Sequence, residues 1–382
     1  MPGLLADIDP DGLIEYSVVY TDRALNHMSQ RFQGVMRDIS RTLKQVYGAQ
    51  SAIVVPGSGS FGMEAVARQF ATGRRCLVIR NGWFSFRWSQ IFDMGGIPAE
   101  TIVLAATPVS NEHEAAFAPP PIDQVVAAIH AQKPELVFAA HVETASGILL
   151  PDDYLQAVAD AVHAEGGLFV LDCIASGALW VNMQATGVDV LISAPQKGWS
   201  GPACCAFVML SERARKAIDQ TVSTSFACDL KKWLNIMEAY EQGSFAYHAT
   251  MPTDALRKVR DTMQEAGHHG FDTLRARQVE LGSRVRALLK ERGFKSVAAP
   301  DFEAPGVVVS YTDDDALQSA RKFVLAGVQA AAGVPLQCNE PAGFKTFRIG
   351  LFGLDKWLNI ERTVETLANA LDQVRTAETV GG

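Results

Sequence analysis

GLFVLDCIASGALWVNMQATGVDVLISAPQK, residues 167–197, is the stretch of sequence that decides the fold. It contains two short apolar runs, at 167–172 and 188–193, and a charged side chain closes or closely follows each run. Continuous apolar runs of this length are typical of strands whose two faces are both covered by helices. The stretch therefore predicts two strands of a parallel sheet, with Asp172 and Lys197 at their carboxyl ends.

The alternation of apolar runs and helical stretches extends outward from these two strands. Repeated β–α alternation is typical of a doubly wound, mostly parallel α/β sheet, which we expect here. Further strands are predicted at 51–55, 75–80, 100–105, 135–140 and 203–210, and helices at 26–48, 61–71, 84–95, 122–131 and 153–165.

The pattern changes after about residue 254. A long helical stretch at 254–293, broken near GHHG, is followed by only two strands and by two more helices. We expect a smaller C-terminal α+β domain, residues 254–382, beside a large domain of residues 15–253, with segment 1–14 packed on the small domain or on a partner subunit. The later strands are predicted at 306–312 and 346–350, and the later helices at 315–330 and 356–374.

Composition narrows the class of protein. The 382 residues include 34 Lys and Arg against 42 Asp and Glu, a net charge of −8, without a block rich in Lys or Arg. This balance argues against a nucleic-acid or membrane partner. The apolar runs are far shorter than the ~20 residues of a membrane helix, no signal-peptide pattern is present, and the six cysteines form no CxxC pair. We therefore expect a cytoplasmic protein.

Ligands of an open α/β sheet bind beyond the carboxyl ends of its strands, so the residues there are candidate site residues. GSGS, residues 57–60, follows the strand at 51–55 and precedes a helix. Small residues and the free N–H groups of a helix N-terminus suit a phosphate group. The motif also fits a flexible turn, and it lacks the GK[ST] of a P-loop and the spacing of a dinucleotide site.

Two charged residues at strand ends add to this pattern. A buried Asp172 needs a cationic or hydrogen-bonding partner, although it also fits a helix cap. Lys197 suits a desolvated Schiff-base nucleophile, although it also fits a surface lysine. A phosphate cradle, a buried carboxylate and a lysine are together the groups that pyridoxal phosphate needs.

Seven short motifs connect these candidates to a known family. They are GSGSFGMEA (57–65), NGWFSFR (81–87), HVETASG (141–147), LDCIASG (171–177), APQKGWSGP (194–202), YHATMP (247–252) and FRIGLFG (347–353). In this order the sequence resembles the class V aminotransferases, which are pyridoxal 5′-phosphate (PLP)-dependent enzymes of fold type I. The resemblance is closest to the alanine–glyoxylate/serine–pyruvate aminotransferase group and runs from about residue 26 to 374.

The resemblance implies a role for each matching residue. Lys197 binds the cofactor covalently and then moves a proton between the substrate Cα and C4′, while Asp172 keeps the ring nitrogen protonated. Arg348 binds the substrate carboxylate through two parallel hydrogen bonds. The other implied cofactor contacts are Ser58, Gly59, Ser60 and Gln196 to the phosphate, Phe84 (or its neighbour Trp83), Thr144 and Ile174 to the ring, and Tyr247 and Thr250 to the phosphate in the neighbouring subunit.

The implied activity is transfer of an amino group from a small amino acid to an α-keto acid such as glyoxylate or pyruvate. The implied assembly is a homodimer with active sites at the subunit interface. Two departures affect the expected substrate. EYSVVYTDRALNH, residues 15–27, replaces the glycine- and proline-rich opening of the family, and Ser60 stands where the alanine–glyoxylate enzymes commonly have His.

Two alternatives and one exclusion follow from the remaining residues. A cysteine-desulfurase-like lyase of the same fold needs a reactive Cys before the C-terminal Arg, and Cys338 precedes Arg348, although without a neighbouring cation in the sequence. A non-catalytic protein of this fold is the second alternative, and the presence of Lys197, Asp172 and Arg348 argues against it, because such a protein needs none of the three. The histidines are not spaced as ligands, so we expect no metal site.

Overall fold

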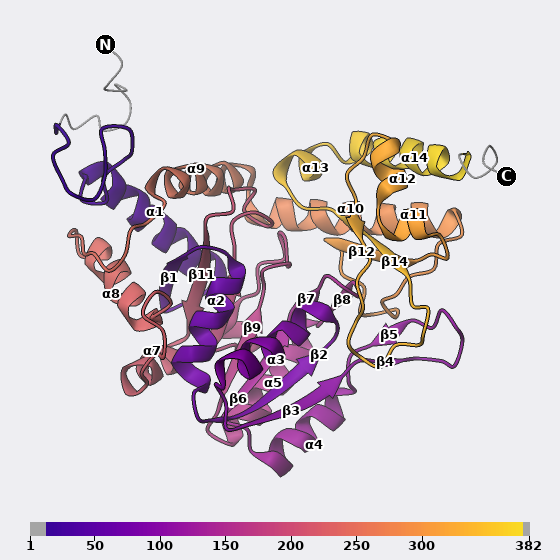
Figure 1. Ribbon diagram of the computed structural model, residues 1–382, viewed down its shortest axis with the longest axis horizontal. Helices are drawn as coiled ribbons and strands as arrows, with labels where there is room; N and C mark the ends of the chain where they lie inside the picture. Colours follow the sequence, from indigo (N-terminus) through magenta and orange to yellow (C-terminus); the bar gives the residue numbers. More distant parts are fainter. Residues whose placement is uncertain (1–12, 377–382) are drawn as a thin grey trace.

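The computed structural model of the chain describes residues 13–376, and a seven-stranded sheet forms its centre (Figure 1). One strand, β11 (Cys205–Leu210), pairs antiparallel with both of its neighbours, whereas the other neighbouring strands pair in parallel. The predicted mostly parallel α/β sheet is confirmed. In spatial order the strands are β1 (Ser51–Pro56), β11, β10 (Val190–Ser193), β9 (Leu168–Asp172), β6 (Leu136–Ala140), β2 (Arg75–Arg80) and β3 (Glu100–Ala105).

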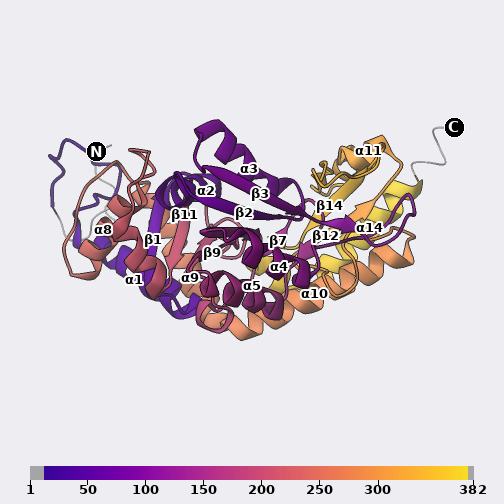
Figure 2. The same cartoon turned by 90° about the horizontal axis from the view of Figure 1, so that it is seen from below.

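Helices cover both faces of this sheet. They include α1 (Gln30–Tyr47), α2 (Gly59–Val66), α3 (Trp83–Gly95), α4 (Ile122–Gln132), α5 (Asp152–Ala164) and α8 (Leu230–Glu241). Figure 2 shows α2 and α3 on one side of the sheet and α4 and α5 on the other. Every residue of β6, β10 and β11 is buried, which explains why their sequences are continuous apolar runs.

Shorter elements connect these layers. After α2 the chain continues as one π-helical turn, η1 (Ala67–Ala71), inside the predicted helix 61–71. The remaining short elements are α6 (Met183–Thr186), α7 (Glu212–Ala217), the 3₁₀ turn η2 (Ile218–Gln220) and two hairpins, β4 (Thr107–Pro108) with β5 (Phe117–Ala118) and β7 (Val142–Glu143) with β8 (Ile148–Leu149).

The C-terminal part contains a second, three-stranded antiparallel sheet in the order β12-β14-β13. Its strands are β12 (Val307–Tyr311), β14 (Thr346–Gly350) and β13 (Ala331–Ala332), and its helices are α9 (Thr253–His269), α10 (Phe271–Glu291), α11 (Asp315–Gln318), α12 (Arg321–Leu325), α13 (Leu354–Leu358) and α14 (Ile360–Thr376). The helix α10 packs against β12 and α14. The domain boundary at residues 253 and 254 stays a prediction, and the predicted packing of residues 1–12 lies outside the described residues.

The predicted C-terminal helices differ in detail from those of the structure. The break near GHHG is confirmed, because Gly270 has a φ of +85° between α9 and α10. The single helix predicted at 315–330 is wrong: α11 and α12 are two short helices, since Ala320 adopts a left-handed φ of +61° between them. The last helix likewise divides at Asn359, where φ is −129°.

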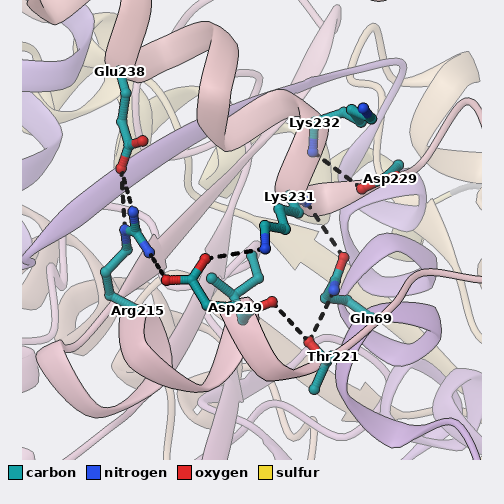
Figure 3. A network of polar contacts seen from close by, with 9 residues as sticks. Gln69, Arg215, Asp219, Thr221, Asp229, Lys231, Lys232 and Glu238 are labelled. Atoms are coloured by element: carbon teal, nitrogen blue, oxygen red, sulfur yellow. Dashed lines mark hydrogen bonds and ion pairs between the residues drawn. The ribbon is translucent and has the colours of Figure 1, made fainter.

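A network of polar contacts holds the segment between η2 and α8 against η1 (Figure 3). Asp219 of η2 accepts a hydrogen bond from Arg215 at 2.9 Å and lies 3.2 Å from the ammonium group of Lys231. The side-chain amide of Gln69, on η1, donates to the hydroxyl of Thr221 at 2.9 Å and accepts from the backbone N–H of Lys231 at 3.3 Å. Both ends of the segment are therefore fixed on the large sheet domain.

Candidate active site

One cavity opens at the carboxyl ends of the parallel strands, where the sequence predicts the site. Predicted residues from five separate segments meet in its wall, together with four that the sequence analysis did not single out. The predicted ones are Ser58, Gly59, Ser60, Phe84, Thr144, Asp172, Ile174, Gln196 and Lys197, and the additional ones are Met63, Arg87, Val142 and Ala175.

Lys197 is held toward this cavity by a tightly packed loop after β10. A Cβ atom on the next residue, Gly198, would lie 2.2 Å from the carbonyl oxygen of Gly177, so only glycine fits. Trp199 is fully buried, with its ring centroid 5.4 Å from that of Trp180. Burial lowers the pKa of the Lys197 ammonium, and the nearby Arg348 lowers it further, while Asp172 opposes the shift. The amine is therefore more readily deprotonated than an ordinary lysine.

Asp172 is the last residue of β9 and is only 7 % exposed. One carboxylate oxygen accepts a hydrogen bond from the backbone N–H of Ile174 at 2.8 Å. Burial raises the pKa of Asp172 to about 6, and the Ile174 hydrogen bond and the charge of Lys197 only partly oppose this. A cationic ligand atom beside the carboxylate would stabilise its ionised form.

The first turn of α2 forms the opposite end of the cavity. Ser58 is the N-cap residue, but its side chain does not cap the helix. The first N–H groups of a helix have no intrahelical acceptor, so those of Gly59 and Ser60 are free for a ligand. A Cβ on Gly59 would lie 2.5 Å from Cδ1 of Ile174, so a larger residue there would displace the Ile174 side chain from the cavity wall. These features suit a phosphate group.

Arg87 is a cation at this end of the cavity that the sequence analysis missed, although it ends the NGWFSFR motif. One of its Nη atoms donates to the Ser60 hydroxyl at 3.0 Å, and its guanidinium lies 5.1 Å from the centre of the Phe84 ring. Phe84 lines the cavity, whereas the ring of the adjacent Trp83 lies 5.7 Å from that of Phe86. The geometry thus favours Phe84 over Trp83 as the residue that would contact the ring of a bound cofactor.

Thr144 and Glu143 contribute from the hairpin after β6. The Thr144 side-chain oxygen is buried and has no hydrogen-bond partner among residues 13–376. A buried hydroxyl without a partner costs about 1–3 kcal/mol, so a ligand polar atom at this point would stabilise it. Glu143 is fully buried next to it and was also missed by the sequence analysis.

Arg348 approaches from the C-terminal sheet, on β14. Its Nε atom donates to the carbonyl oxygen of Ala332 at 2.7 Å, and the guanidinium centre lies 5.5 Å from the Phe84 ring. Burial lowers the pKa of Arg348, although Glu143 opposes this. Arg348 is therefore not one of the residues that line the cavity, but it lies beside Phe84, which is one.

Tyr247 and Thr250 do not line the cavity of their own chain. They lie in the segment between α8 and α9, where their hydroxyl groups are 3.2 Å apart and Tyr247 is 54 % exposed. Their predicted contact with a neighbouring subunit stays a prediction.

Cys338 lies outside the cavity and is buried. Its thiol donates to the Arg80 carbonyl oxygen at 3.4 Å. The Arg80 guanidinium donates to the carbonyl oxygen of the adjacent Gln337 at 3.3 Å and lowers the pKa of Cys338, so the expectation that no cation lies nearby is wrong. Burial nevertheless raises the pKa of Cys338 to about 12, with further increases from Glu143 and Glu340 and only a small opposing effect from Arg80. This is the opposite of the thiolate that a lyase of this kind needs.

The described part of the chain has neither a metal-binding cluster nor a membrane-spanning helix. Between residues 13 and 376, no three or more His, Cys, Asp or Glu side chains gather where they could hold a metal ion. No helix in this range combines the length and the apolar character that crossing a membrane requires.

Comparison with known proteins identifies the family. The family profile described as aminotransferase class-V matches residues 13–313. The chain belongs to the class V aminotransferases. This class V chain is 24 % identical over 360 residues to an alanine–glyoxylate aminotransferase of Rattus norvegicus, covering 91 % of this chain and 82 % of that protein. It is 27 % identical over 359 residues to a 2-aminoethylphosphonate–pyruvate transaminase of Paraburkholderia xenovorans, covering 92 % and 90 %.

Solved structures show the fold of this class V aminotransferase independently. An alanine–glyoxylate aminotransferase from Nostoc sp. matches with a TM-score of 0.78 at 21 % identity, over 91 % of this chain and 88 % of that one. A pyridoxamine–pyruvate aminotransferase from Mesorhizobium loti matches with a TM-score of 0.75 at 16 % identity, over 95 % and 88 %. The predicted fold type I is confirmed.

Proposed function

We propose that this aminotransferase acts with pyridoxal 5′-phosphate and moves an amino group from a small amino acid to an α-keto acid such as glyoxylate or pyruvate. The observation that carries the proposal is that Lys197 and Asp172 face one cavity whose far end is the first turn of α2. The relatives support the acceptor class, since their names include glyoxylate and pyruvate.

The residues in the cavity fit the cofactor. When bound, PLP supplies an electron sink that stabilises negative charge at the substrate Cα. Asp172, whose pKa is raised by burial, would hold a protonated ring nitrogen as a matching cation. The unpartnered hydroxyl of Thr144 would contact a polar atom on the ring. Phosphate contacts would come from Ser58, Gly59, Ser60 and Gln196, and the two ring faces would pack on Phe84 and Ile174.

Lys197 and Arg348 would act on the substrate. An amine with a lowered pKa can hold the cofactor covalently and then accept and return the proton at the substrate Cα. Arg348 would bind the substrate α-carboxylate through two parallel hydrogen bonds. Its Nε bond to Ala332 orients the guanidinium, so the Nη groups are those that would bind the carboxylate.

A reduction experiment tests the proposed cofactor chemistry. Protein reconstituted with PLP should show the visible absorption band of the bound cofactor, and borohydride should attach it irreversibly to the peptide that contains Lys197. In a separate, unreduced sample, single amino acids mixed with the protein should remove this band, and the one that does so fastest identifies the donor. A modified peptide carrying any other lysine would overturn the assignment.

We also propose a cytoplasmic homodimer. Large apolar side chains are exposed on three segments of the chain, for example Val18 and Phe226 at 77 % or more and Tyr247 at 54 %. Hydrogen bonds connect these segments, from Tyr20 to the Met251 carbonyl at 3.0 Å and from a His248 ring nitrogen to the Phe226 carbonyl at 2.8 Å. A second copy covering this surface would bury it and bring Tyr247 and Thr250 to the neighbouring site.

The proposed cytoplasmic location rests on the cysteines. None of the six is in a disulfide, which fits a reducing compartment.

Mixing two inactive variants tests the shared site. The Lys197→Ala chain and the Tyr247→Ala/Thr250→Ala chain should each be weak alone. Random mixing makes half of the dimers mixed, and each of these would hold one intact site, so activity should recover to about a quarter of the wild-type value. No recovery on mixing would exclude the contribution of Tyr247 and Thr250 across the interface.

A further inference from the structure

Glu143 is fully buried, and its carboxylate accepts four hydrogen bonds. One oxygen accepts from the backbone N–H of Phe84 at 3.2 Å and of Ala145 at 3.0 Å. The other accepts from the backbone N–H of Ser85 at 2.8 Å and from the Ser85 hydroxyl at 2.7 Å. Four donors satisfy the two oxygens, so the ionised carboxylate fits this position.

These contacts fasten the first turn of α3 to the hairpin of β7 and β8. The Ser85 hydroxyl in turn accepts from the backbone N–H groups of Asn81 at 2.9 Å and Gly82 at 3.1 Å. The backbone of Gly82 packs directly on the Glu143 side chain, since a Cβ there would lie 2.7 Å from Cγ of Glu143. Two segments that are far apart in the sequence are therefore joined through one carboxylate.

The two segments that Glu143 joins both line the cavity. The first turns of α3 carry Phe84 and Arg87, and Arg87 donates to Ser60 at the phosphate end. The hairpin carries Thr144, the residue next to Glu143, with its unpartnered hydroxyl. Glu143 itself is not among the cavity-lining residues, so it acts on the cavity only through these neighbours and through its charge.

We infer that Glu143 is a positioning residue, which holds Phe84 and Arg87 at one wall of the cofactor cavity in register with Thr144. This inference rests on the proposed cofactor. The isosteric Glu143→Gln change isolates the role, because an amide has one acceptor oxygen and its NH₂ group would face N–H donors. The start of α3 would then lose hydrogen bonds to a charged acceptor, and Phe84 and Arg87 would no longer be held in place. Part of the free energy of PLP binding would be spent on restoring their positions, so PLP would bind more weakly.

The test compares Glu143→Gln with a matched control, Asp189→Asn. Asp189 is also a buried carboxylate, and it accepts from the Phe169 N–H at 3.0 Å, the Ser211 hydroxyl at 2.9 Å and a His163 ring nitrogen at 2.7 Å. It precedes β10 and so lies at the opposite end of the sheet from the cavity. Both variants should lower the melting temperature of the apoprotein.

Only Glu143→Gln should change the binding and the environment of the cofactor. We expect its dissociation constant for PLP to rise about 10- to 150-fold, the range for loss of one charge-assisted hydrogen bond, with a changed visible circular dichroism of the bound cofactor. Asp189→Asn should stay within about twofold of wild type on both measures. A Glu143→Gln protein whose PLP affinity and dichroism match wild type, despite a lower melting temperature, would overturn the inference.

A milder variant covers the case in which Glu143→Gln does not fold. Ser85→Ala removes one donor to Glu143 and leaves the three backbone donors in place, so it should weaken PLP binding in the same direction by a smaller factor. Unchanged PLP binding in Ser85→Ala would count against the inference. Failure of the wild-type protein to bind PLP at Lys197 would instead refute the proposed function.

Discussion

The raised pKa of Asp172 leads to an unusual prediction for stability. In the apoenzyme, burial raises this pKa to about 6, whereas an unfolded aspartate has an ordinary pKa of about 3.9. The folded state therefore binds a proton more tightly than the unfolded state, and the apoenzyme loses stability as the pH rises from about 4 to above about 6. At about 1.4 kcal/mol per pH unit, the loss is about 3 kcal/mol.

The Asp172→Asn variant removes this titration and keeps the side-chain shape. Its amide oxygen can still accept the 2.8 Å hydrogen bond from Ile174. The apo variant should therefore be more stable than apo wild type at pH 8, by up to about 3 kcal/mol, and the difference should shrink as the pH is lowered through 6 toward 4. Urea denaturation of both apoproteins at pH 8 and at pH 5 measures this.

Binding of the cofactor should reverse the order of stability of Asp172→Asn and wild type. The ionised carboxylate gains a cationic partner in the holoenzyme, so wild type should be the more stable protein once PLP is bound. The variant should also lose several orders of magnitude in rate, because a neutral amide cannot keep the ring nitrogen protonated. If the apo variant were less stable than wild type at pH 8, the reasoning from burial would be refuted, and a variant with near-wild-type turnover would remove Asp172 from the mechanism.

Three further substitutions separate the roles of the other residues. Lys197→Ala should abolish turnover while the fold remains intact by circular dichroism and the proposed dimer by light scattering, since the side chain faces the cavity; loss of the fold would show a packing role instead. Arg348→Lys should lower kcat/KM about 10- to 150-fold in both half-reactions, because lysine keeps the charge but not the planar fork, and should barely change cofactor absorbance. Cys338→Ala should leave transamination almost unchanged in the same stopped-flow assay, since the thiol is buried with its pKa near 12; an inactive Cys338→Ala beside an active Arg348→Lys would favour a lyase.

The parts of the site that could be predicted are those with local signals. An apolar run that ends in a charged residue predicted both the strand and the position of Asp172, and the same holds for the lysine after β10. The helix α8 carries ordinary local signals too, since Asp229 caps it through the Lys232 N–H, yet the sequence analysis did not include it. The break at Ala320 could not be foreseen, because alanine seldom adopts a positive φ without tertiary constraint.

The residues that were missed gain their roles from partners far along the chain. Arg87 reaches Ser60, and Glu143 reaches the start of α3, 58 residues from Ser85. Neither contact has a sequence signature, because it depends on how α2, α3 and the hairpin after β6 are brought together by the parallel strands. Their place inside family motifs was the available signal, and it gave no indication of which side chain each would contact.

The two buried carboxylates of the site show how similar groups acquire different roles. Four donors surround the Glu143 oxygens, so its hydrogen-bonding capacity is used within the protein, and removing the charge should disturb the segments it joins. Asp172 accepts one hydrogen bond, from the backbone N–H of Ile174, and burial raises its pKa. A cationic ligand atom would therefore stabilise its ionised form. The first arrangement suits a fixed support and the second suits a ligand contact. Neutralising Asp172 should therefore stabilise the empty protein, whereas neutralising Glu143 should destabilise it, and this opposite response of two neighbouring carboxylates is what their hydrogen bonds require.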